Sequence, residues 1–241
     1  MILAPIDFHS HILPGIDDGS RSVEETLAML RMEAEQGVRH IVATPHFYAR
    51  HDYPDEFLKK REESYRLLQE HLDGRGDLPG ITLGAEVHYF PRMSESDVLQ
   101  SLTLGKSQFI LVEMPMKKWT DNMYRELEDI RVKQGLTPVV AHIDRYLRPF
   151  QTARTFHRLG SLPVLVQANA EFFTDRKTAR KAMYLLSNQE IHLVGSDCHD
   201  PQNRKPNLGG AFSAIGQRLG DEWLNWIYGY QHMVLKEEMK P

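Results

Sequence analysis

Short apolar segments alternate with amphipathic segments along nearly the whole chain of 241 residues, and this alternation is the strongest constraint on its fold. Each apolar segment is rich in β-branched residues and is bounded by Gly, Pro or polar residues, as expected for a buried strand. The predicted strands are residues 6–9, 41–44, 81–86, 109–113, 137–141, 164–169 and 191–196. This alternation favours a parallel sheet buried on both faces, which could be open or closed into a barrel.

The segments between the predicted strands have the features of helices. Ser22-Val23-Glu24-Glu25 matches a capping box, and Gly37 suits the C-terminal cap of the helix that follows. Further helices are predicted at residues 57–72, 95–102, 122–134, 150–158 and 175–187 and near the C-terminus. The last of these carries an aromatic stripe that we expect to pack on the core, formed by Trp223, Trp226, Ile227 and Tyr230.

Composition excludes several classes of protein. A net charge of −4 gives no electrostatic footprint for nucleic-acid binding, and a single Cys excludes a disulfide framework or a Cys-rich zinc module. No apolar run approaches the roughly 18 residues of a membrane helix, and the first residues lack the pattern of a signal peptide. We therefore expect a cytoplasmic protein with neither membrane insertion nor a nucleic-acid partner.

Imidazole and carboxylate side chains follow the C-terminal ends of all but one of the predicted strands. In a barrel these ends converge on one mouth. A purely structural role would have to explain separately why so many costly buried polar groups share one topological position, whereas a metal cluster explains them together. The predicted metal ligands are His9, His11, Asp17, His46, Glu86, Glu113, His142, Asp197 and His199.

This set is too large for one ion with four to six ligands, so two or three ions and a bridging carboxylate are expected. Nitrogen and oxygen donors without a thiolate suit Mn, Fe or Zn. Three divalent ions would carry more charge than the carboxylates neutralise, which favours a dianionic ligand such as a phosphate monoester. The expected reaction is hydrolysis, in which a hydroxide bridging two ions attacks phosphorus in line.

Several residues near the predicted centre suit a phosphate substrate. Arg145 and Arg204 follow the fifth and seventh strands, and we expect these catalytic residues to bind phosphate oxygens and offset charge in the transition state. Tyr48 and Arg50, in an aromatic and cationic loop, and His88, after the third strand, are predicted to bind the substrate. The group that protonates the leaving oxygen is left open.

Three segments carry a resemblance to a known family: His9-Ser10-His11-Ile12-Leu13-Pro14-Gly15-Ile16-Asp17-Asp18-Gly19, Ala43-Thr44-Pro45-His46 and Ala141-His142-Ile143-Asp144-Arg145-Tyr146. They resemble the PHP (polymerase and histidinol phosphatase) superfamily of metal-dependent phosphoesterases, and within it the bacterial CpsB/YwqE-type protein-tyrosine phosphatases. The resemblance implies an α/β fold, a distorted (β/α)7 TIM-like barrel, present as a single PHP-type domain with C-terminal helices over residues 1–241.

The resemblance also implies a trinuclear centre, usually of manganese, and its ligands by position. The first ion would take His9, His11, Glu86 and Asp197; the second Glu113 and His142, with Glu86 as the bridge; the third Asp17, His46 and His199. The implied substrate is a phosphotyrosyl protein, a bacterial tyrosine autokinase that governs capsule and exopolysaccharide synthesis. Two departures from the family pattern, Ile143-Asp144 and Cys198, touch no proposed ligand.

Other functions remain open from the sequence. A small phosphomonoester such as histidinol phosphate would fit the same metal centre. The segment from Cys198 to Arg204 matches C-x5-R, the pattern of cysteine-dependent tyrosine phosphatases, although Pro201 removes one amide from a phosphate cradle. A non-catalytic binding module that has lost its metal is the third alternative. Oligomer formation is also left open.

Overall fold

The strands of the computed structural model are short and pair in parallel. The structure describes all residues except 1–3, 73–75, 148–152 and 236–241. Its strands are β1 (Ile6–Ser10), β2 (His40–Ala43), β3 (His46–Phe47), β4 (Gly80–Leu83), β5 (Glu86–His88), β6 (Phe109–Glu113), β7 (Thr137–Val140), β8 (Leu165–Asn169) and β9 (Leu193–Gly195).

The strands follow one another around a distorted barrel. One sheet has the order β1-β2-β4 and the other the order β3-β5-β6-β7-β8-β9. A bridge between Ser10 and Cys198, together with a hydrogen bond from Asp197 N to His9 O of 2.7 Å, joins the end of β9 to β1. When β2 with β3 and β4 with β5 are each counted as one bent strand, the ring has the seven strands of the predicted (β/α)7 barrel.

The bends in two strands were not predicted. The segment expected as one strand over residues 81–86 forms β4 and β5, separated by Gly84 and Ala85. Thr44 and Pro45 separate β2 from β3 in the same way, and Pro45 has no N–H to continue a ladder of hydrogen bonds. Each bend starts a new short strand with a predicted metal ligand, His46 or Glu86.

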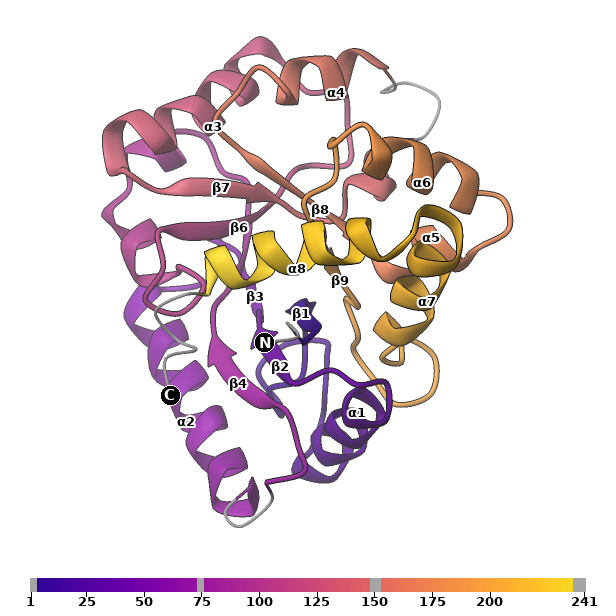
Figure 1. Cartoon of the computed structure of the whole chain (residues 1–241). Helices are drawn as coiled ribbons and strands as arrows, with labels where there is room; N and C mark the ends of the chain where they lie inside the picture. Colours follow the sequence, from indigo (N-terminus) through magenta and orange to yellow (C-terminus); the bar gives the residue numbers. More distant parts are fainter. Residues whose placement is uncertain (1–3, 73–75, 148–152, 236–241) are drawn as a thin grey trace.

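Helices surround this barrel (Figure 1). They are α1 (Val23–Glu35), α2 (Pro54–Leu72), α3 (Asp121–Gln134), α4 (Ala153–Leu159), α5 (Ala170–Thr174), α6 (Ala179–Ser187), α7 (Leu208–Leu219) and α8 (Asp221–Val234). Residues 95–102, predicted as an α-helix, instead lie mostly in 3-10 turns at Met93–Glu95 and Asp97–Ser101. The predicted 175–187 helix begins later, at Ala179, after the separate helix α5, and the start of the predicted 150–158 helix lies outside the described residues.

The predicted caps of α1 are confirmed in part. The Ser22 side chain accepts a hydrogen bond from Glu25 N, and Gly37 has a φ of 84° after the helix end. The Glu25 carboxylate, however, accepts from the backbone N–H and the guanidinium of Arg21 instead of from Ser22 N. The reciprocal hydrogen bond of the predicted capping box is therefore donated to Glu25 by the backbone N–H of Arg21, one residue before Ser22.

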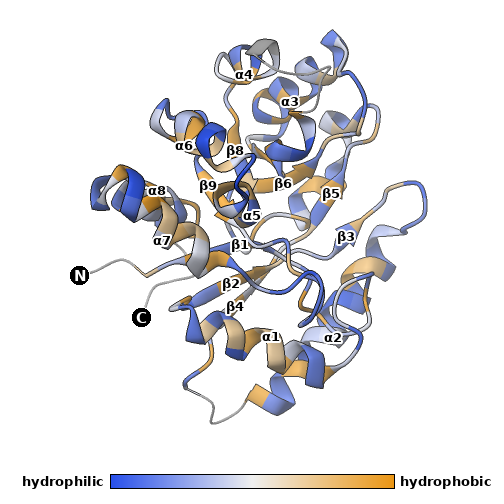
Figure 2. Cartoon of the chain, turned by 90° about the vertical axis from the view of Figure 1, so that its right-hand side faces the viewer, coloured by the Kyte–Doolittle hydropathy of each residue, from blue (hydrophilic) through white to orange (hydrophobic). Residues whose placement is uncertain are grey.

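The buried apolar residues form two cores. The inner core fills the barrel, and the outer core lies between the strands and the helices. Along β6, Phe109 and Leu111 belong to the inner core, whereas Ile110 and Val112 pack in the outer core. This alternation is the period of two expected for strands buried on both faces. In Figure 2 the strands are mostly hydrophobic, and much of the hydrophilic colour lies on the helices.

Helix α8 covers the N-terminal end of the barrel, the end opposite the candidate site (Figure 1). Gln231 is fully buried there, and its side chain bonds both the N–H and the C=O of Ile6 on β1. Ile227 of the predicted aromatic stripe is buried, while Trp226 and Tyr230 pack around His192. Among the described residues, the structure contains no helix with the length and apolar character that crossing a membrane requires.

Candidate metal centre

His9 and His11 of the HxH segment point their rings at the same place. Their Nε2 atoms lie 3.1 Å apart, and Glu86 Oε2 lies 3.2 Å from the first and 3.4 Å from the second. Asp197 Oδ1 is 3.6 Å from His9 Nε2 and 3.5 Å from His11 Nε2. The structure thus brings together the four side chains expected around the first ion, although they come from three separate strand ends.

A second group of donor atoms forms around the other oxygen of Glu86. Its Oε1 lies 2.8 Å from His142 Nε2, which is also 3.5 Å from Glu113 Oε1. Glu86 is 1% exposed and His142 is fully buried, so bulk water cannot hydrogen-bond to their polar atoms. Because its two oxygens face different groups, Glu86 has the geometry expected of a bridging carboxylate.

The third group contains His46, His199 and an aspartate, but the aspartate is Asp18 and not the expected Asp17. Asp18 Oδ1 lies 3.3 Å from His46 Nε2 and 3.5 Å from His199 Nε2. Asp17 instead lies behind His11, and its carboxylate accepts hydrogen bonds from His11 Nδ1, Gly19 N and His46 N. The geometry therefore favours Asp18 as a ligand and Asp17 as a residue that orients His11.

The polar atoms of these groups fit metal ions better than they fit one another. Two imidazole Nε2 atoms 3.1 Å apart cannot both donate or both accept, and each also faces carboxylate oxygens. Glu86 Oε2 and His199 Nε2 are buried and have no hydrogen-bond partner among the described residues, and His46 Nδ1 is 2.9 Å from Glu86 Oε2 without hydrogen-bond geometry. Buried polar atoms are rarely left unpaired, so convergent unpaired donors indicate a cation site.

Two carboxylates of the centre, Glu86 and Glu113, are held in their charged form. Burial alone would raise the pKa of Glu86, but the charge of His9, the hydrogen bond from His142 and the nearby imidazoles of His11 and His46 lower it well below the ordinary value. In the same way, hydrogen bonds from His142 and His88 outweigh burial and lower the pKa of Glu113 to about 2. Buried charges of this kind require cationic partners.

The backbone is strained at two of the candidate ligands. His142 has a φ of 30° and Asp197 a φ of 54°, in the left-handed region that non-glycine residues rarely adopt. Such conformations persist where the surrounding structure holds them, and they cluster at functional sites. Both residues lie directly beyond the ends of their strands, β7 and β9, at the mouth of the barrel.

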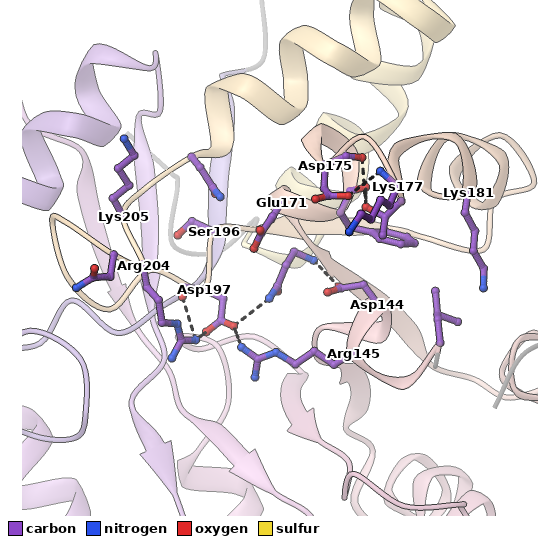
Figure 3. Close-up of a pocket in the computed structure, with 16 residues that line it drawn as sticks. Asp144, Arg145, Glu171, Asp175, Lys177, Lys181, Ser196, Asp197, Arg204 and Lys205 are labelled. Atoms are coloured by element: carbon purple, nitrogen blue, oxygen red, sulfur yellow. Dashed lines mark hydrogen bonds and ion pairs between the residues drawn. The ribbon is translucent and has the colours of Figure 1, made fainter. Parts of the chain in front are cut away.

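Arg145 and Arg204 meet on the carboxylate of Asp197 (Figure 3). Arg204 Nη2 donates to Asp197 Oδ1 at 2.9 Å, and Arg145 Nη2 donates to Oδ2. The side chains of Arg145 and Arg204 remain 35% and 41% exposed, so each keeps donors free for a ligand. The structure therefore brings both predicted catalytic residues to the edge of the first donor group.

Of the three predicted substrate-binding residues, two lie beside the centre. The Tyr48 ring is 5.2 Å from that of His46 and 5.4 Å from that of His88, measured between centroids. His88 Nδ1 is also 2.8 Å from Glu113 Oε2, so His88 orients a candidate ligand. Arg50 is exposed in the turn after β3, and no described contact links it to the centre.

Sequence reasoning missed the polar residues of β8. Gln167 is fully buried; its Oε1 accepts a 2.6 Å hydrogen bond from His142 N and lies 3.4 Å from His9 Nδ1. Asn169, two residues further on, donates to Asp197 Oδ2 and accepts from Gln167. Two amides at a spacing of two in a buried apolar strand were the signal that could have revealed them.

The cysteine-dependent alternative does not fit the segment from Cys198 to Arg204. Cys198 is 1% exposed, and burial raises the pKa of its thiol well above the ordinary value. The amides of His199 and Asp200 donate to the carbonyl of Arg204, and the later amides donate to the Asp200 carboxylate. These amides are therefore not available to cradle a phosphate, and the thiol is not an accessible nucleophile.

Comparison with known proteins identifies a family and agrees with the fold. The sequence profile of the family described as capsular polysaccharide synthesis, CpsB/CapC, matches residues 5–234. The chain is 30% identical over 225 residues to the tyrosine-protein phosphatase CpsB of Streptococcus pneumoniae, with 89% of this chain and 91% of that protein covered. It is 26% identical over 226 residues to the tyrosine-protein phosphatase YwqE of Bacillus subtilis, with 90% and 86% covered.

A solved structure shares the fold over nearly the full length of both chains. It comes from the crystal structures of B. subtilis YwqE and S. pneumoniae CpsB, described as unique metal-dependent tyrosine phosphatases. The TM-score is 0.84 at 22% identity, and the match covers 96% of this chain and 94% of the other. Because the family profile spans almost all of the described residues, the chain belongs to the CpsB/CapC family of capsular polysaccharide synthesis proteins.

Proposed function

We propose that this chain is a metal-dependent protein-tyrosine phosphatase. The observation that carries the proposal is the meeting of three groups of imidazole and carboxylate donors at one barrel mouth, with Arg145 and Arg204 beside them. This combination of cation sites and guanidinium donors suits the hydrolysis of a phosphomonoester. The tyrosine-protein phosphatases among the relatives support the choice of phosphotyrosine as substrate.

We assign three divalent metal ions to the centre, most simply manganese, with iron or zinc as the alternatives that nitrogen and oxygen donors allow. The first ion would be held by His9, His11, Glu86 and Asp197. The second would be held by Glu86, Glu113 and His142. The third would be held by Asp18, His46 and His199, with Asp18 in the place that the sequence suggested for Asp17.

The ions would supply Lewis acidity that lowers the pKa of water toward neutrality and offsets the charge of the phosphate. Arg145 and Arg204 lie on either side of Asp197 and would direct their free N–H groups at the phosphate oxygens as charge grows in the transition state. Asp197 keeps both guanidinium groups in place before the substrate arrives. This preorganisation removes the cost of reorienting them during the reaction.

Tyr48 and His88 would contact the aromatic ring of the substrate, because their own rings lie side by side next to His46. A tyrosyl oxygen has a pKa near 10 and leaves more readily than an alkyl alcohol, so it depends less on a general acid. We further propose that the chain forms one PHP-type domain in the cytoplasm and that its substrate is a phosphotyrosyl protein, a bacterial tyrosine autokinase of capsule synthesis.

The experiment that tests this function compares three substrates on protein stripped of metal with a chelator and then supplied with one divalent ion at a time. A phosphotyrosyl peptide should be hydrolysed after the metal is restored and not before. The same peptide with phosphoserine, and histidinol phosphate as a small phosphomonoester, should react far more slowly. Equal or faster reaction of histidinol phosphate would replace the proposed substrate class with the small-molecule alternative.

A further inference from the structure

A cavity of about 680 Å³ opens beside the candidate metal centre, and Asp197 is one of its lining residues (Figure 3). Asp197, Arg145 and Arg204 form the wall that the cavity shares with the candidate phosphate site. The rest of its lining comes from the neighbours of Arg145, from the end of β8, from α5, from the segment between α5 and α6, from the start of α6 and from the segment after β9. Its volume is in the range of pockets that bind ligands of several side chains in size.

The cavity adjoins the candidate phosphate site at the barrel mouth. On the proposed function, the phosphate is bound beside Asp197 and the tyrosyl ring meets Tyr48 and His88, which follow the second and third strands of the barrel. The cavity lies over the fifth to seventh strands, so it is reached from the same phosphate by way of Arg145 and Arg204. The peptide chain is attached at the end of the tyrosyl ring opposite the phosphate, so a side chain a few residues from the phosphotyrosine would reach the cavity by crossing the barrel mouth beside Arg145 and Arg204.

The charges that the cavity offers to a ligand are mostly positive. Lys177, Lys181 and Lys205 line it and are exposed, and none of them forms an ion pair with another described residue. In Figure 3, Lys205 lies on one side of the cavity and Lys177 and Lys181 lie on the other. Unpaired ammonium groups around a concave surface attract an anionic group and orient its approach.

The acidic residues of the lining are largely occupied by internal bonds. Asp197 accepts from both arginines and Asn169, and Asp144 is partly buried and accepts from Asn169 N. Asp175 accepts from the backbone N–H of Lys177 at 2.7 Å. Glu171 and Asp175 are both exposed, and both carboxylates oppose the lysines.

We propose that this cavity is a specificity site that binds an acidic side chain of the substrate a few residues from the phosphotyrosine. The inference rests on the proposed function and adds the chemical class of the flanking sequence that the enzyme selects. Lys177 and Lys181 are the residues that make the selection, because they belong to the cavity and lie beyond the two arginines that hold the phosphate. Glu171 weakens the preference for an acidic side chain, because its negative charge repels an incoming carboxylate.

The test measures kcat/KM for phosphotyrosyl peptides that carry one glutamate at successive positions on either side of the phosphotyrosine, in a background of glutamine. The wild-type protein should prefer at least one glutamate position on one side only. Replacing Lys181 by Ala should reduce that preference about threefold, and replacing Lys177 and Lys181 together should reduce it about tenfold, as expected for solvent-exposed ion pairs. Glu171→Gln should increase it.

Two further variants keep the test specific to the cavity. Arg180→Ala is the matched control, because Arg180 is an exposed cation of the same helix but does not line the cavity. It should leave the preference unchanged. Lys181→Glu should favour a peptide with lysine at the selected position, a gain that damage to the fold cannot produce. Added salt should weaken the wild-type preference, because the pairs are near the surface.

Equal kcat/KM for all the glutamate peptides and the glutamine peptide would overturn this inference and leave the proposed function intact. A loss of preference in Arg180→Ala as large as that in Lys181→Ala would also overturn it, because the effect would then come from net charge and not from the cavity. Failure to hydrolyse any phosphotyrosyl peptide with any divalent ion would instead contradict the proposed function.

Discussion

Asp17 Oδ2 lies 2.7 Å from Nδ1 of His11, and this hydrogen bond fixes which ring nitrogen of His11 faces the metal centre. Burial favours neutral groups, but the hydrogen bond from His11 and its charge lower the pKa of Asp17 to about 2. Carboxylates that bind the far nitrogen of a ligating histidine hold the ring and raise its basicity. Asp17 and Asp18, neighbours in the chain, therefore have different roles.

The first prediction separates these two roles. Asp18→Ala should remove one ion from the metal stoichiometry, because it deletes a ligand of the third group. Asp17→Asn should keep the stoichiometry and weaken metal affinity about 10–100-fold, because His11 loses its orienting carboxylate. Metal analysis after equilibrium dialysis distinguishes the two. Loss of an ion in Asp17→Asn, with full occupancy in Asp18→Ala, would reverse the assignment.

The second prediction concerns the arginines at the edge of the centre. Arg145→Ala should lower kcat for a phosphotyrosyl peptide about 10²–10³-fold, because one donor to the transition state is lost. Arg145→Lys should recover little of the activity, because an ammonium group cannot contact Asp197 and the phosphate in the planar geometry of a guanidinium. Steady-state kinetics with unchanged metal content provide the measurement. A rise in KM alone, with kcat preserved, would limit Arg145 to ground-state binding.

The third prediction tests the thiol. Cys198→Ala should retain the activity of the wild-type protein, because the sulfur is buried and its pKa is raised by burial. The variant should lose about 1 kcal/mol of unfolding free energy through the small cavity it leaves. Kinetics and urea denaturation on the same preparation separate the two effects. Inactivity of a folded, metal-loaded Cys198→Ala would revive the C-x5-R alternative.

The fourth prediction concerns a pair of carboxyl groups behind β1. Glu33 of α1 and Asp7 of β1 are both fully buried, and neither oxygen of Glu33 has a hydrogen-bond partner in the structure. Burial, together with the charge of Asp7, raises the pKa of Glu33 well above its ordinary value of 4.5. The folded state therefore favours the neutral carboxyl of Glu33. This preference stabilises the folded state fully only at pH values below the ordinary pKa of 4.5.

This contribution should be lost as the pH rises above 4.5 toward the raised pKa of the folded state. Glu33→Gln has no proton to lose, so its unfolding free energy should exceed that of the wild-type protein by an amount that grows with pH, to about 1–3 kcal/mol. Urea denaturation over a pH series measures the difference. Glu35→Gln, an exposed position of the same helix, is the control and should show no such trend. A constant difference across pH would contradict the prediction.

The positions of the candidate ligands could be predicted because a parallel barrel brings the ends of its strands to one mouth, whatever their separation in sequence. His9, Glu86, His142 and Asp197 could be grouped on that basis alone. The choice between Asp17 and Asp18 could not, because both lie in the loop after β1, where no strand periodicity determines the direction of a side chain. That choice depends on the turn that lets Gly19 N and His46 N donate to Asp17.

The bends between β2 and β3 and between β4 and β5 also could not be predicted from the sequence. Hydrophobic periodicity shows that residues 81–86 are buried and extended, but it does not show that the chain changes sheets at Gly84. The close approach of Leu104 to Gly84, which leaves 2.9 Å to an added Cβ, arises from tertiary packing. Gln167 was overlooked for a different reason, since a neutral amide within an apolar strand has no charge or metal-binding nitrogen that would mark it as part of a site.

The most direct measurement is a crystal structure of the protein grown with manganese, with anomalous scattering recorded at the manganese absorption edge. Three anomalous peaks are expected at the barrel mouth: between His9, His11, Glu86 and Asp197; between Glu86, Glu113 and His142; and between Asp18, His46 and His199. The absence of anomalous density among these side chains, in crystals of protein that hydrolyses phosphotyrosine, would contradict the assignment of this centre as the site of the reaction.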